Sequence, residues 1–132
     1  MLADAAQAVE GKLYILGGGW TVTGPAPAPC AIVMKFEVPW NEANRQHTWA
    51  LRLQNEDGQP VQVAGPDGTQ EVWITGEFEV GRPTGIVEGT PLDLPMVVGL
   101  GPLPLAPGRY EWRLSINEES AEDWGLSFTV RG

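Results

Sequence analysis

A Pro-Gly corner that opens directly onto an alternating strand is the feature that most constrains the fold. The corner is Pro107-Gly108, and it lies within the run Leu105–Ile116. The apolar residues on one face of this run are Tyr110, Trp112, Leu114 and Ile116. The residues between them are Arg109, Glu111, Arg113 and Ser115. Because successive side chains of a strand point to opposite faces, this pattern predicts an antiparallel strand with one buried face.

Similar alternation recurs along the chain, and 17 glycines and 12 prolines separate the alternating segments. These segments are Lys12–Leu16, Ile32–Val38, Thr48–Gln54, Val61–Val63, Val72–Val80, Leu92–Val98 and Trp124–Val130. The glycines of Gly17–Gly19 predict a bend, after which the first strand continues through Trp20–Thr23. Pro95 predicts an edge position for its strand.

Short strands separated by turn residues, without a long helical period, predict an all-β fold. We expect an antiparallel Greek-key β-sandwich of seven to eight strands, immunoglobulin-like in architecture. Residues 1–132 form one domain on this prediction, and residues 1–10 form an N-terminal segment that is either a short helix or an extra strand.

The residues Leu105-x-Pro107-Gly108-x-Tyr110 resemble the tyrosine corner of immunoglobulin-like and fibronectin type III sandwiches. The resemblance implies that the Tyr110 hydroxyl bonds to upstream backbone and that Pro107, Gly108 and Tyr110 are structural. Antibody domains also carry a Cys…Trp…Cys pattern, which this chain lacks because Cys30 is its single cysteine. An immunoglobulin receptor function therefore does not follow.

The front half is similar to an uncharacterised bacterial family of small sandwich domains. The residues that carry this resemblance are Ala3-Asp4, Gly11-Lys12-Leu13, Ile15, Gly17, His47 and Asp57-Gly58. The resemblance implies a fold, and it implies that these motif residues have structural roles. It implies no activity.

The charge of the chain argues against two classes of partner. The formal net charge is −9 and the few Lys and Arg residues are scattered, so the chain repels phosphate backbones and anionic lipid surfaces. We therefore expect neither a nucleic acid nor a membrane as partner.

The lone Cys30 is expected to be a small buried hydrophobe in a reducing compartment, and the N-terminus lacks the pattern of a secretion signal. A cytoplasmic location is the expectation.

The residues needed for common catalytic chemistry are missing. His47 is the only histidine, no serine lies in a Gly-x-Ser-x-Gly elbow, and Gly17–Gly19 lacks the ending of a phosphate loop. One cysteine and one histidine fall short of a zinc ligand set. We therefore expect no enzyme, no cofactor and no metal centre, and we interpret His47 as making a strand-end hydrogen bond.

Two tryptophans differ from the rest in their surroundings. Trp49, Trp112 and Trp124 share faces with aliphatic residues and are predicted to be buried, whereas Trp40 lies in a polar loop and Trp73 shares its face with acids. The candidate binding residues are Trp40, Asn41, Asn44, Arg45, Trp73, Glu77 and Glu79.

These observations favour a non-enzymatic structural or protein-interaction module that binds a protein partner or self-associates. The alternative is a carbohydrate- or calcium-binding β-sandwich domain that uses Trp40 or Trp73, if these are exposed, or the acidic turns. A hydrolase using Glu77 and Glu79 ranks below these two hypotheses. A phage or secretion-machine component also fits the predicted fold.

Overall fold

The computed structural model describes residues 1–132, and its regular structure is all β apart from one 3₁₀ turn. The elements are β1 (Leu2–Ala3), β2 (Ala5–Val9), β3 (Lys12–Leu16), β4 (Val22–Thr23), β5 (Cys30–Val38), η1 (Trp40–Glu42), β6 (His47–Asn55), β7 (Gln62–Gly65), β8 (Gly68–Glu71), β9 (Trp73–Phe78), β10 (Leu92–Leu100), β11 (Gly108–Ile116) and β12 (Gly125–Val130). The expected seven or eight strands become twelve because several predicted segments divide into short pieces. No helix is long and apolar enough to span a membrane.

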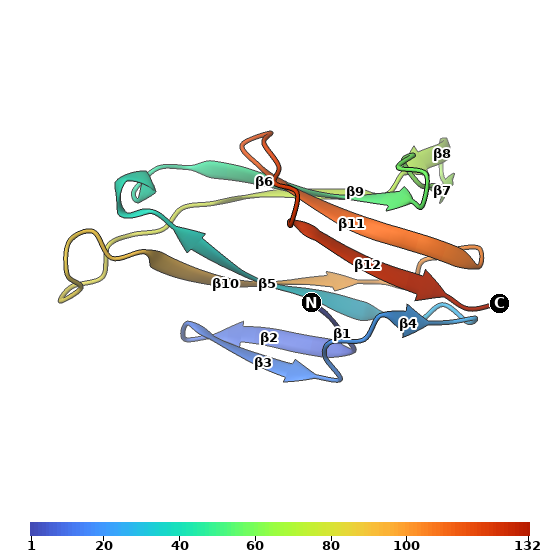
Figure 1. Ribbon diagram of the computed structural model, residues 1–132, viewed down its shortest axis with the longest axis horizontal. Coiled ribbons are helices and arrows are strands. Elements are labelled where there is room, and N and C mark those ends of the chain that lie inside the picture. Colours follow the sequence, from blue (N-terminus) through green and yellow to red (C-terminus); the bar gives the residue numbers. More distant parts are fainter.

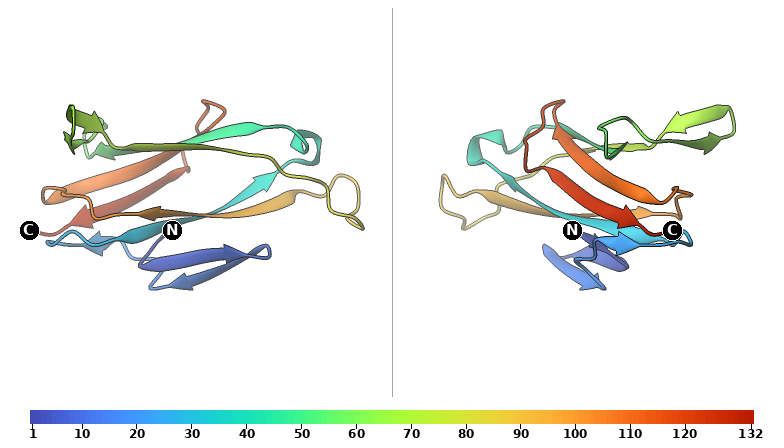
Figure 2. Two further views of the ribbon diagram at one scale, coloured as in Figure 1. Left: turned by 180° about the vertical axis from the view of Figure 1, so that it is seen from behind. Right: turned by 45° about the vertical axis from the view of Figure 1, so that its right-hand side comes forward.

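Two sheets form the main layers. One has the strand order β4-β12-β11-β6-β9, and the other has the order β1-β5-β10. All neighbours are antiparallel except β4 and β12, which run parallel. Figures 1 and 2 show the larger sheet as one layer and β5 with β10 as the layer facing it.

Apolar residues from both sheets meet in one core. Trp112 is only 2% exposed, and it lies between Leu53 of β6 and Leu126 of β12 in the strand register. The other buried members of the core are Leu2, Ile32, Phe36, Val38, Ala43, Trp49, Leu51, Leu92, Phe128 and Val130. Gly76 points into the core from β9 and packs directly against the Trp49 ring. A Cβ at this position would lie 2.7 Å from ring atoms of Trp49, so the site requires glycine. The alternation in the sequence therefore predicts the inward faces.

A two-stranded hairpin forms a third layer. β2 and β3 pair across a two-residue turn at Glu10-Gly11, and both turn residues have positive φ as a type I′ turn requires. β2 contacts β5 and β10, and Figures 1 and 2 show the hairpin on the side of that sheet opposite β11 and β12. Val33 of β5 is only 4% exposed although it faces away from the core.

Two local expectations require correction, and one open alternative is decided. Residues 1–10 form extra strands and not a short helix, because their backbone hydrogen bonds are made in β1 and β2. The single strand expected over Val72–Val80 is divided at Val72, which donates to the Val61 carbonyl and accepts from Leu53. The continuation expected over Trp20–Thr23 shortens to β4, because the glycine bend sends the chain to the other sheet.

The Pro-Gly corner has the geometry that its sequence pattern predicts. The Tyr110 hydroxyl donates a 2.6 Å hydrogen bond to the Ala106 carbonyl, and the ring stacks on Phe128 with 5.7 Å between centroids. Tyr110 thus ties the loop before β11 to the strand that carries Trp112.

We expect Tyr110→Phe to lower the free energy of unfolding by about 1 kcal/mol, because it removes one hydrogen bond and keeps the ring. Urea denaturation followed by tryptophan fluorescence measures this change. Thr69→Val is the control, since Thr69 is exposed on β8 and this change also removes one hydroxyl at nearly constant shape. Equal stability of the two variants would contradict a role for the corner bond.

Candidate functional site

The two main sheets separate along one side of the molecule. β1 pairs with only two residues of β5, Ala31 and Ile32, and β4 pairs with only two residues of β12, Thr129 and Val130. The remaining edges of β5 and β12 have no strand beside them. The chain between β1 and β4 instead forms the β2–β3 hairpin, and this leaves an opening between the two sheets.

The free edge of β5 presents unpaired backbone groups. Val33 exchanges hydrogen bonds with Met1, so its N–H and C=O point away from β10. Alternate residues of a strand direct these groups to the same side, so Lys35 and Glu37 also point theirs away from β10. Pro95 lies opposite Lys35 and needs no donor in the ladder. The Lys35–Glu37 edge is therefore free to accept another strand.

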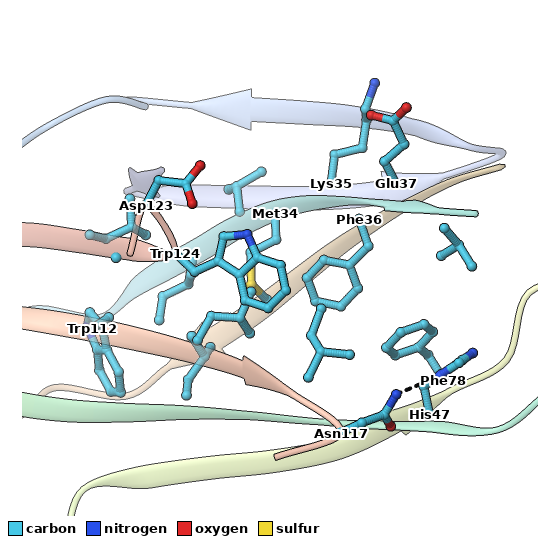
Figure 3. A pocket seen from close by; sticks show the side chains of 18 of the residues that line it. Met34, Lys35, Phe36, Glu37, His47, Phe78, Trp112, Asn117, Asp123 and Trp124 are labelled. Atoms are coloured by element: carbon cyan, nitrogen blue, oxygen red, sulfur yellow. Dashed lines mark hydrogen bonds between the residues drawn. The ribbon is translucent and has the colours of Figure 1, made fainter. Parts of the chain in front are cut away.

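The opening leads into a cavity of about 750 Å³ that is lined mainly by apolar residues. Figure 3 shows Met34 and Phe36 of β5 facing Trp124 across it, and the buried Trp112 lines the cavity as well. Lys35 and Glu37 direct their side chains away from the cavity. Further apolar lining residues are Ile32, Val38, Leu51, Phe78, Leu114, Ile116 and Leu126. We call this cavity and the β5 edge beside it the side groove.

A buried histidine closes one end of the side groove. His47 begins β6, and its ring stacks on Phe78 with 5.1 Å between centroids. Its Nε2 lies 2.9 Å from the Glu42 carbonyl, which can only accept, so Nε2 carries the proton. Nδ1 then accepts from the Asn117 side-chain amide at 2.9 Å (Figure 3). Because the Asn117 oxygen accepts from the Thr48 N–H, the orientation of the Asn117 amide is fixed.

The mouth of the side groove is acidic. Lys35 forms a 3.7 Å ion pair with Asp93, and Glu42 forms a 3.2 Å ion pair with Arg45. Glu37, on the outer side of the β5 edge, and Asp123, at the opposite side of the opening, have no ion-pair partner. Burial lowers the pKa of the Met1 amino group, which donates to the Val33 carbonyl at the rim. The uncompensated side-chain charge at the mouth is therefore negative.

The predicted binding residues of the first loop lie beside the side groove and are engaged in local contacts. Trp40 forms part of η1, and the Arg82 guanidinium lies 4.8 Å from the centroid of its ring and donates to its carbonyl. Asn41 lies next to Trp40 in a shallow surface hollow. Asn44 has a positive φ and donates its N–H to Val80, while Arg45 pairs with Glu42.

The second group of predicted binding residues is on the outer face of the larger sheet. Trp73 is 51% exposed and lies 5.2 Å from the guanidinium of Arg52. Glu77 accepts from Gln46, and Glu79 is exposed on the same face. Trp73 begins β9, whereas Trp40 packs on Arg82, which follows the other end of that strand. The structure does not bring the two tryptophans together.

Groups that could hold a metal or act as a nucleophile are also separated. No cluster of three or more His, Cys, Asp or Glu side chains is placed to hold a metal ion. Burial raises the pKa of the Cys30 thiol, and the nearby Asp4 carboxylate raises it further. The thiol consequently stays protonated at neutral pH and is a poor nucleophile.

Sequence reasoning missed the side groove. Met34, Phe36, Leu114 and Leu126 have the signature of ordinary core residues, and the sequence says nothing about which edges stay unpaired. No sequence signal marks these open edges, because β1 and β4, which cover only part of them, are each two residues long.

These features define a small all-β domain with two facing sheets and an open side. The chain belongs to DUF6941, a family of unknown function, whose model matches residues 1–131. No curated protein matches the sequence.

We expect His47→Leu to lower the free energy of unfolding by about 2 kcal/mol, because it leaves the Asn117 amide and the Glu42 carbonyl without their partner. Asn117→Gly removes the other partner of the His47–Asn117 hydrogen bond, and glycine tolerates the positive φ at this position. In a double-mutant cycle measured by urea denaturation, the two losses should fall short of additivity by about 1 kcal/mol. Additive losses would show that the two side chains are not coupled.

Proposed function

We propose that the protein is a non-enzymatic protein-interaction module whose binding site is the side groove. An extended segment of a protein partner adds to the free edge of β5 and inserts alternate side chains between the sheets. The observation that carries this proposal is the unpaired Lys35–Glu37 backbone directly beside an apolar cavity. Addition of a strand to an open sheet edge supplies backbone hydrogen bonds for affinity and side-chain pockets for specificity.

The shape of the side groove favours a polypeptide ligand. Every second side chain of an added strand faces the cavity, so the segment needs apolar residues at alternate positions. Met34, Phe36 and Trp124 would contact them. The unpaired Glu37 and Asp123 at the mouth favour a Lys or Arg beside the apolar positions. The expected ligand is therefore an extended peptide of alternating apolar residues with a basic residue next to them.

The proposal includes a finer description of the fold as a Greek-key, immunoglobulin-like sandwich. The order β12-β11-β6-β9 corresponds to the G-F-C-C′ sheet of that architecture, and β1-β5-β10 corresponds to A-B-E. Tyr110 lies near the start of β11, which is where the tyrosine corner occurs in strand F. On this correspondence, the side groove lies where the first strand changes sheets. A cytoplasmic location is part of the same proposal.

Selection from a library of random peptides tests the binding site directly. We expect the selected peptides to share alternating apolar residues and a basic residue, and to bind with micromolar affinity by isothermal titration calorimetry. The affinity tag belongs at the C-terminus, because residues added before Met1 would continue β1 along the edge of β5.

Lys35→Pro should weaken peptide binding at least tenfold, because it removes an outward N–H that the fold does not use. Asp93→Pro is the matched control, since Asp93 lies opposite Glu37 and points its own N–H to the free edge of β10. Circular dichroism checks that both variants are folded. Equal loss of binding in both variants, or none in Lys35→Pro, would contradict this site. Binding of saccharides or of calcium by the protein, together with a failure to select any peptide, would support the alternative functions.

A further inference from the structure

The β2–β3 hairpin exposes apolar side chains on the face that no other layer covers. Leu16 is 71% exposed and Tyr14 is 56% exposed, and Val9 on the same face is also exposed. Leu13 and Ile15 project to the opposite face, toward the sheet that contains β5 and β10. A two-stranded hairpin is marginally stable without further packing, so this exposed face is costly for an isolated chain.

The outer edge of β3 also carries unpaired backbone groups. The two-residue turn makes Val9 and Lys12 a hydrogen-bonded pair, and alternation then makes Gln7 and Tyr14 the next such pair. The N–H and C=O groups of Leu13 and Ile15 therefore point away from β2. No other segment pairs with this edge, and Figures 1 and 2 show β3 on the outside of the molecule.

β3 lacks the protective residues that occur at the free edges of β10, β5 and β9, and β2 and the open part of β12 lack them as well. The edge of β10 contains Pro95 and Asp93, the free edge of β5 contains Lys35 and Glu37, and β9 contains Glu77. Charged residues and prolines at such positions prevent indiscriminate strand pairing. In β3 the four residues Leu13–Leu16 are all apolar, and only Lys12 is charged.

The charge distribution favours a second copy of the chain as the partner for this edge. The net charge of −9 makes two copies repel each other over most of their surfaces. Leu13–Leu16 carry no charge, and the charged residues near the β3 edge lie at its two ends, Glu10 and Lys12 at the turn and Asp4 beside Gly17, so two copies can approach along the centre of the edge. A strand edge with a two-fold axis at its centre is self-complementary, as a closed dimer requires.

We propose that the protein forms a symmetric homodimer in which β3 pairs antiparallel with β3 of a second copy, centred on Tyr14. In this register Leu13 and Ile15 of one copy exchange backbone hydrogen bonds with Ile15 and Leu13 of the other. The two hairpins become one four-stranded sheet, and the exposed rings of Tyr14 pack against each other on its outer face. This interface is separate from the side groove. The peptide-binding proposal can therefore be contradicted without affecting the dimer proposal, and the reverse is also true.

Sedimentation velocity from low to high micromolar concentration tests the dimer. We expect Leu16→Lys to raise the dimer dissociation constant by at least roughly tenfold, because each introduced lysine lies opposite Lys12 of the other copy. Val87→Lys is the matched control, since Val87 is also apolar and is 77% exposed in a distant loop. A wild-type chain that stays monomeric throughout, or a dimer that Leu16→Lys leaves intact, would overturn the proposal.

Cross-linking tests the register without relying on a loss of binding. Tyr14→Cys in a Cys30→Ser background should form a disulfide-linked dimer under mild oxidation, because directly opposed residues in a non-hydrogen-bonded pair have adjacent Cβ atoms. Gln7→Cys in the same background is the control, since the two copies of Gln7 would lie about three strand spacings, roughly 14 Å, apart. Equal cross-linking of both variants, or none at position 14, would overturn the proposed pairing.

Discussion

The burial of apolar side chains between two sheets is the constraint on which the rest of this structure depends. Trp112 lies at its centre, flanked in register by Leu53 and Leu126, and Ile32 and Phe36 approach from the other sheet. Removing such large apolar surfaces from water is the dominant favourable contribution to folding. A slip of one residue in β11 would turn Trp112 to solvent, so this burial also fixes the register.

The second constraint is that each backbone N–H and C=O group must bond either to a neighbouring strand or to water. The candidate sites lie at strand edges where these groups have no neighbouring strand. The first part of the chain is divided between β1 and β4, each of which pairs with only two residues of its neighbour. Half of β5 therefore stays open beside an apolar cavity, and the intervening residues fold into a hairpin with its own open edge. Both surfaces originate in the same division of one strand, although they differ in chemistry.

The sequence predicts the individual strands better than their arrangement. The alternation around Trp112 and the Pro-Gly corner at Pro107-Gly108 identify a strand because both signals are local. The side groove could not be predicted, because Met34 and Phe36 have the same pattern whether or not a strand lies beside β5. Trp40 and Trp73 stood out as exposed aromatics in the sequence, but each is paired with an arginine and they lie at different ends of β9.

The ends of the β2–β3 hairpin meet each other in space. The Asp4 N–H lies 3.2 Å from the Gly17 carbonyl, and the Gly19 N–H lies 2.8 Å from the Leu2 carbonyl. The hairpin is thus an insertion whose entry and exit are already joined by the framework, so its length and composition can change while the ten other strands keep the core around Trp112.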